Sequence, residues 1–289
     1  MKKKYYICTY SILITEKMAE TVKKVLFVNT EMFPFVPETK LSRICRDLPQ
    51  GIQERKREIR SFMPRYGCIN ERKNQLHEVI RLSGMNLIIG DVDRPLVIKV
   101  ASISAARLQV YFLDNDDYFK RKQLGLDTEG HAFADNDERA IFFARGILET
   151  VKKLRWAPDI IHCHGWISHL APLYLKKMYR EDPIFSNSKV VLSLYDDSTA
   201  EPMSADFASK IEAGGISAND IPYLSEPNGI NLAKTAAMYS DAVIFGDKEI
   251  DGDLAGFCSS LGIPSMPYDE EKLSNGSYID EYNSFYDTL

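Results

Sequence analysis

Lys24-Val-Leu-Phe-Val-Asn29 is a short, nearly continuous apolar run bounded by polar residues. Such a run is typical of a parallel strand with helices on both faces, since neither face then meets water. Later runs of the same character are separated in several places by helical stretches: 59–63, 96–103, 108–113, 159–163, 190–194 and 242–245. This rhythm predicts an α/β fold with a Rossmann-like, doubly wound, mainly parallel sheet.

The best-defined helix is expected over residues 137–154. Apolar residues recur there at three- and four-residue spacing and form one stripe: Ala140, Phe143, Ile147, Val151 and Leu154. The side-chain oxygens of Asp135, Asn136 and Asp137 are expected to cap its first turn. Pro158 prevents the helix from continuing further.

Composition narrows the function classes. The 289 residues are 45% hydrophobic and 27% charged, which is ordinary for a globular protein, and the net charge is −5. That charge gives no broad basic field, so we expect neither nucleic acid nor a membrane as partner. Five cysteines, an odd number without a Cys-x-x-Cys pair, favour a reducing cytoplasm over a disulfide scaffold.

Composition also divides the chain into parts. Met18 lies just before the first convincing strand, so residues 1–22 are expected to be an N-terminal extension, disordered or upstream of the true start. Residues 23–247 carry the strand and helix rhythm. Within them, residues 199–226 show little periodicity, which predicts a long irregular connection with one helix. Residues 248–289, which are acidic and aromatic, predict a packed tail rather than a second domain.

Candidate chemistry lies in Asp159-Ile-Ile-His-Cys-His-Gly-Trp166, where a buried strand runs into a helix. His162 and His164 share one face of the strand because side chains alternate. His162 is interpreted as a hydrogen-bonded core residue. His164 falls at the strand's carboxyl end, where open α/β sheets bind ligands, so both a functional and a structural role stay open. No metal is expected, since a zinc site needs more ligands and the other histidines lack supporting spacing.

The order of several motifs resembles that of glycogen and starch synthases. The matching segments are Glu31-Met-Phe-Pro-Phe35, Met63-Pro-Arg-Tyr-Gly67, Val110-Tyr-Phe-Leu-Asp-Asn115, Asp135-Asn136 with Arg139 and Phe143, and His162-Cys-His-Gly-Trp166. The resemblance covers residues 23–247 and implies the N-terminal half of a GT-B glycosyltransferase, with the second GT-B domain absent. It implies glucosyl transfer from ADP-glucose to an α-1,4-glucan, with no cofactor. By this resemblance His164 would be the catalytic residue, and His164 and Trp166 would bind the transferred sugar. Trp166 would support that turn or start the helix by packing.

Three positions depart from the family pattern. The family's Lys-x-Gly-Gly, which holds the nucleotide phosphates, appears as Pro37-Glu38-Thr39-Lys40, so Lys40 is the candidate nucleotide-binding cation. The family's histidine–asparagine pair after a later strand is Tyr195-Asp196. The aspartate usual after the second histidine is Gly165.

Three functions remain open at this stage. The first is a glucosyltransferase half that works with a separate polypeptide supplying the missing domain, because half a cleft gives little rate enhancement. The second is a non-catalytic glucan-binding or regulatory protein, with surface aromatics Tyr5, Tyr66 and Tyr118 stacking on sugars. The third is a structural α/β module that binds only a protein partner.

Overall fold

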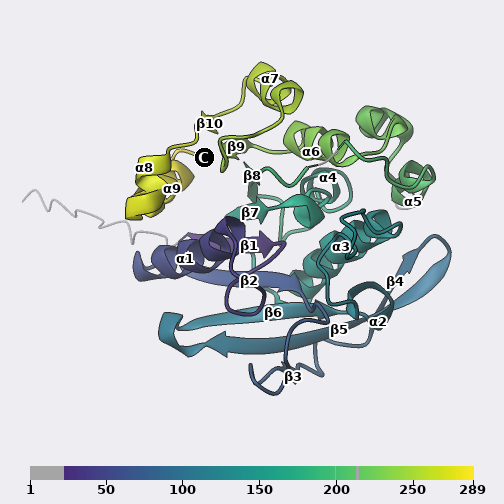
Figure 1. Cartoon of the computed structure of the whole chain (residues 1–289), viewed down its shortest axis with the longest axis horizontal. Helices are drawn as coiled ribbons and strands as arrows, with labels where there is room; N and C mark the ends of the chain where they lie inside the picture. Colours follow the sequence, from purple (N-terminus) through teal and green to yellow (C-terminus); the bar gives the residue numbers. More distant parts are fainter. Residues whose placement is uncertain (1–22, 199, 213–214) are drawn as a thin grey trace, which may run out of the picture.

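The computed structural model describes residues 23–198, 200–212 and 215–289, and within them one ten-stranded sheet organises the molecule (Figure 1). The strand order is β10-β9-β8-β7-β1-β2-β6-β5-β3, and β4 pairs with β5. The strands are β1 Lys24–Asn29, β2 Glu58–Pro64, β3 His77–Glu78, β4 Met85–Ile89, β5 Val92–Ile103, β6 Leu108–Asp114, β7 Ile160–His164, β8 Lys189–Leu194, β9 Ala242–Phe245 and β10 Ser265–Met266. From β10 to β6 all neighbours are parallel, whereas β3, β4 and β5 pair in antiparallel fashion.

Helices cover both faces of the sheet. The α-helices are α1 Lys40–Glu54, α2 Asp116–Phe119, α3 Asn136–Leu154, α4 Ala171–Lys177, α5 Phe207–Glu212, α6 Gly229–Met238, α7 Gly252–Ser260, α8 Glu270–Asn275 and α9 Tyr278–Asp287. Helices α1, α8 and α9 lie on one side and α3, α4 and α6 on the other (Figure 1). The predicted doubly wound α/β sheet is therefore confirmed.

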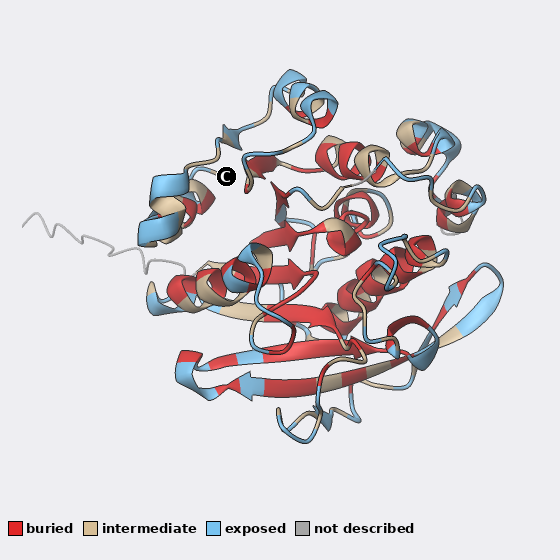
Figure 2. Ribbon diagram, in the orientation of Figure 1, coloured by how far each residue is buried: buried red, intermediate tan, exposed pale blue. Residues whose placement is uncertain are grey.

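Strand β1 shows that both faces of the sheet are buried. Val25 and Phe27 pack with α1 and α9, whereas Leu26 and Val28 belong to the larger core that contains α3. All four side chains are fully buried, and Figure 2 shows the same for most of the central strands. A continuous apolar run is the sequence pattern that a strand between two cores requires.

Every strand expected from the sequence is present, and three further strands were not expected. Strands β3 and β10 contain two residues each, too few for an apolar run. Strand β4 contains Leu87-Ile-Ile89, but its residues alternate between buried and exposed. The connection 199–226 contains α5 and two 3-10 turns. Residues 1–22, with the expected start at Met18 and the aromatic Tyr5, lie outside the described residues.

Residues 248–289 pack against the domain rather than forming a second one. They contain α7, β10, α8 and α9, although no strand and helix rhythm was expected there. Strand β10 pairs with β9, and α9 packs on α1. The sheet thus continues beyond Asp247, where the boundary of the domain was expected. No helix in the described part of the chain is both long and apolar enough to cross a membrane.

Two expectations about side chains are wrong. Tyr66 and Tyr118 are buried, not surface aromatics. The Tyr66 hydroxyl donates to the Thr30 carbonyl at 2.9 Å, and the Tyr118 hydroxyl donates to Glu138 at 2.6 Å. Both rings therefore pack in the core, and each hydroxyl has the hydrogen-bond partner that a buried tyrosine needs.

The expected helix 137–154 is confirmed as α3, but its predicted capping is not. Asp135 is the N-cap residue and its side chain makes no capping hydrogen bond. Asp135 instead pairs with Arg121, and Asp137 pairs with Lys210. The carboxylates that were expected to cap the helix therefore form ion pairs with residues distant in the sequence.

Candidate functional site

A cavity of about 350 Å³ opens at the carboxyl ends of β1, β7 and β8. Thr30 and Glu31 follow β1, Trp166 follows β7, and Asp196 and Asp197 follow β8, and all five line it. Strand β1 pairs with β2 on one side and with β7 on the other, so the chain changes direction of winding between β1 and β7. Ligands of open α/β sheets bind at such a switch point.

Trp166 forms one wall of this cavity. The turn before it contains Gly165 at φ 80°, a left-handed conformation that favours glycine. The indole lies against Gly125, since a Cβ on Gly125 would be 3.0 Å from the indole Cζ2. Trp166 is partly buried, so one part of the ring faces the cavity and another faces the protein.

Arg139 packs against Trp166 and bonds to neighbouring residues of the cavity lining. It is completely buried, and its guanidinium donates to the Asn136 side chain at 2.7 Å and to the Leu124 carbonyl at 2.6 Å. Asn136 in turn donates to the Gly125 carbonyl at 2.8 Å. Aromatic rings surround the cation at 5.3–5.9 Å: Tyr66, Phe119, Phe133 and Trp166. Burial lowers the pKa of Arg139 to about 10, which still leaves it charged at neutral pH.

The cavity is also lined by acidic residues. Glu31, Asp196, Asp197 and Glu201 line the cavity, and among the described lining residues there is no lysine, arginine or histidine. Burial raises the pKa of Asp197 to about 7, although the Trp166 amide that it accepts at 2.7 Å acts in the opposite direction. Burial also raises the pKa of Glu31. A cavity with this lining suits an uncharged or cationic ligand better than a diphosphate.

His162 and His164 lie side by side below the cavity, with ring centroids 3.9 Å apart. Both are completely buried. The nitrogens of His162 bond to the Tyr286 hydroxyl at 2.6 Å and to Ser193 at 2.7 Å, which confirms it as a hydrogen-bonded core residue. His164 ends β7 as expected, and its Nδ1 bonds to the Tyr195 hydroxyl at 2.8 Å.

The structure does not bring all predicted site residues together. Trp166 lines the cavity, but His164 does not. Burial lowers the pKa of His164 to about 3, so the ring is neutral at physiological pH. Lys40 begins α1, and its ammonium lies 3.0 Å from Asp247 and 3.2 Å from the Tyr268 hydroxyl, outside the cavity lining. Its charge is therefore already paired.

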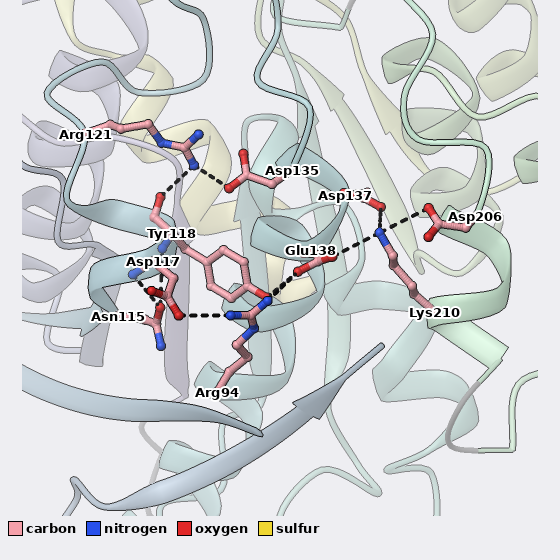
Figure 3. A network of polar contacts seen from close by, with 10 residues as sticks. All are labelled: Arg94, Asn115, Asp117, Tyr118, Arg121, Asp135, Asp137, Glu138, Asp206 and Lys210. Atoms are coloured by element: carbon pink, nitrogen blue, oxygen red, sulfur yellow. Dashed lines mark hydrogen bonds and ion pairs between the residues drawn. The ribbon is translucent and has the colours of Figure 1, made fainter. Parts of the chain in front are cut away.

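A polar network fixes the neighbouring elements at the start of α3 (Figure 3). The ammonium of Lys210 on α5 lies 2.8 Å from Asp137, 3.1 Å from Glu138 and 3.1 Å from Asp206. Glu138 also contacts Arg94 and the Tyr118 hydroxyl, which ties β5 and α2 to the same point. Among the described residues, no group of three or more histidine, cysteine or acidic side chains has the arrangement of a metal site.

Comparison with known proteins assigns the chain to a family. The starch synthase catalytic domain family matches residues 24–251. The chain belongs to the starch synthase catalytic domain family. It is 43% identical over 182 residues to glycogen synthase from Chlorobium limicola and 41% identical over 180 residues to that from Chlorobaculum tepidum. Each match covers 62% of this chain and 37% of the relative, so the chain matches little more than a third of these family members.

A solved structure agrees on the fold. The catalytic domain of starch synthase IV from Arabidopsis thaliana, bound to ADP and acarbose, superposes with a TM-score of 0.67. The match covers 87% of this chain and 52% of that one, at 17% sequence identity. The similarity at this identity concerns the fold, which is that of a GT-B starch synthase.

Sequence reasoning missed the residues that shape most of the cavity. Asp197 had a usable signal, because Asp196 and Asp197 lie just beyond the carboxyl end of a buried strand, as Gly165 and Trp166 do. Arg139 appeared only as part of a motif. A fully buried arginine is uncommon, and a single sequence does not distinguish it from an exposed helix residue.

Proposed function

We propose that this chain is the acceptor-side half of a glycogen or starch synthase and takes part in glucosyl transfer from ADP-glucose to an α-1,4-glucan. The bond between the glucosyl C1 and ADP breaks, C1 bonds to a glucan hydroxyl oxygen, and ADP and the hydroxyl proton leave. A second GT-B domain would supply the donor side of the cleft. The observation that carries the proposal is the Trp166-walled cavity at the β1/β7 switch point of a starch synthase fold.

The residue roles follow from position. Trp166 would contact the sugar, because an indole face packs well on a sugar ring and this one borders the cavity. His164 keeps the role of sugar contact in the proposal, but it is fully buried, so that contact requires the residues covering it to rearrange. Lys40 would reach a nucleotide phosphate only after releasing Asp247 and Tyr268.

The test measures transfer of labelled glucose from ADP-glucose to maltoheptaose. We expect no transfer by residues 1–289 alone and transfer when a second GT-B domain is supplied. Trp166→Phe should reduce transfer, whereas Trp156→Phe, at a tryptophan that bonds to Glu58 away from the cavity, should not. Absence of transfer with every candidate partner that carries such a domain would contradict the proposal.

The acidic cavity favours a second candidate, a non-catalytic glucan-binding protein. Four acidic residues and no cation in the described lining oppose a diphosphate, whereas the carboxylates of Glu31, Asp196 and Glu201 can accept hydrogen bonds from sugar hydroxyls. Calorimetric titration separates the two. Binding of maltoheptaose without ADP-glucose favours this candidate, binding of ADP-glucose favours the transferase, and binding of neither leaves a protein partner.

A further inference from the structure

The turn from β7 to Trp166 is held from two neighbouring strands. On the β1 side, the amide and hydroxyl of Thr30 both donate to the His164 carbonyl, at 2.9 and 3.1 Å. On the β8 side, the carboxylate of Asp197 accepts from the Trp166 amide at 2.7 Å through Oδ2. The residue at the centre of the turn is Gly165.

Gly165 leaves the space that the Asp197 carboxylate fills. A Cβ at position 165 would lie 2.9 Å from Asp197 Oδ2 and 2.4 Å from Thr30 Oγ1, both too close for real atoms. A side chain at 165 would therefore require Thr30 or the Asp197 carboxylate, or both, to move away from the turn. Since φ at Gly165 is 80°, the backbone also disfavours any other residue.

We propose that Asp197 is the positioning residue of this cavity: it reaches from the end of β8 into the space beside Gly165 and fixes Trp166 as the wall against which the ligand binds. The carboxylate reaches this turn from another strand, 32 positions further along the chain. The role in ligand binding rests on the proposed function.

The surroundings of Asp197 favour positioning over direct catalysis. One oxygen holds the Trp166 amide, and the other oxygen is enclosed with no hydrogen-bond partner among the described residues. An enclosed oxygen is poorly placed to meet a ligand. Burying a carboxylate costs free energy, and the hydrogen bond from the Trp166 amide offsets part of that cost. The physical effect of Asp197 thus passes through the Trp166 backbone.

The test compares two substitutions at 197 in a Trp156→Phe background, which leaves Trp166 as the single tryptophan. Asp197→Asn keeps an acceptor oxygen for the Trp166 amide. Asp197→Leu removes it, and Asp197→Ala replaces that variant should the leucine chain fail to fold. Asp93→Asn, at an exposed residue of the β4–β5 hairpin, controls for loss of one charge.

We expect Asp197→Asn and Asp93→Asn to bind maltoheptaose within about threefold of the parent, and Asp197→Leu to bind about tenfold more weakly, the size of one lost hydrogen bond to a charged group. Trp166 emission in the unliganded chain should shift to the red only in Asp197→Leu. Gly165→Ala should reproduce the leucine variant, and the double variant should be no worse than either single one.

Two results would overturn this inference. One is Trp166 emission in Asp197→Leu that matches the parent. The other is an Asp197→Asn chain as impaired as Asp197→Leu, since charge and not the amide contact would then matter. If the parent binds no maltoheptaose, the proposed function fails instead, and the emission of the unliganded variants alone decides whether Asp197 positions Trp166.

Discussion

Among the residues that the structure describes, Arg139 is the largest completely buried side chain, and none of their carboxylates lies within ion-pair distance of its guanidinium. Its partners are the Asn136 amide oxygen, the Leu124 carbonyl and aromatic faces. Cation–π contacts and two hydrogen bonds therefore offset the loss of hydration. At the residue scale, the wall of the cavity depends on this one cation.

Replacing Arg139 by methionine should destabilise the chain by about 2–4 kcal/mol, because the Leu124 carbonyl and the Asn136 side chain lose their donors inside the core. Urea denaturation followed by circular dichroism measures the change. Arg180→Met is the matched control, because Arg180 is exposed, and should change stability by less than about 0.5 kcal/mol. Equal stabilities of the two variants would contradict the assigned role.

His169 is a second buried polar residue, and neither ring nitrogen has a partner among the described residues. Burial lowers its pKa from 6.5 to about 3. Between pH 6.5 and 3 the unfolded chain therefore binds a proton at this site that the folded chain does not. Stability from this group is present above pH 6.5 and is lost as the pH falls, by about 1.4 kcal/mol per pH unit.

His169→Leu should remove that loss. At pH 7 the variant should be within about 1 kcal/mol of the parent, since no hydrogen bond to a described residue is broken. From pH 7 to 4.5 its stability should fall by about 2–3 kcal/mol less than that of the parent. Urea titrations at several pH values measure this difference, and exposed His77→Leu serves as control. Parallel pH profiles of parent and variant would refute the prediction.

At the element scale, the first turn of α3 connects α5, β5 and α2 through ion pairs and a hydrogen bond. Asp137 is completely buried and meets Lys210 of α5, while Glu138 meets Arg94 of β5 (Figure 3). Burial raises the pKa of Asp137, although the Lys210 ammonium opposes that change. The pair therefore holds a short helix, α5, whose own six residues are too few to be stable alone.

Lys210→Met should destabilise the chain by about 3 kcal/mol, because Asp137 is left buried without its partner. Amide hydrogen exchange in α5 should become faster than in α3. Adding Asp137→Asn should restore part of the stability, since the buried charge is then removed as well. Lys73→Met, at an exposed lysine, is the control, and unchanged exchange in α5 would argue against the junction.

At the scale of the whole molecule, residues beyond Asp247 complete the fold. Tyr278, Tyr282 and Tyr286 of α9 are buried against the α1 face of the sheet, and Tyr286 bonds to His162 of β7. Three tyrosines that each bury about 150 Å² correspond to roughly 11 kcal/mol at about 25 cal/mol per Å². This upper estimate is comparable with the total stability of a typical domain.

A chain that stops at Asp247 should therefore lose cooperative folding. The free energy of α9 docking is of the order of the whole stability, and its loss also exposes the apolar face around Phe27. Thermal unfolding followed by near-ultraviolet circular dichroism measures this. Serine at positions 278, 282 and 286 of the full chain should have the same effect. A truncated chain with the parent's melting temperature would contradict it.

The sequence predicted the central strands and α3 because each of them carries a local pattern. A continuous apolar run such as that of β1 fits only a strand between two layers, and the stripe of α3 fits only a helix with one buried face. Strands β3 and β10 are too short for such patterns, and β4, although it contains Leu87-Ile-Ile89, is a partly exposed strand paired with β5. Local reasoning does not detect a partner distant in sequence.

The sequence by itself therefore determined the fold class, the family resemblance and the position of Trp166 at a strand end, because these depend on residue order and periodicity. Only the tertiary structure decided which side chains meet. It separated His164 from the cavity, paired Lys40 with Asp247, buried Tyr66 and Tyr118, and brought Asp197 to the turn at Gly165. Such contacts join residues on different strands and helices, and their geometry is set by packing rather than by neighbours in the chain.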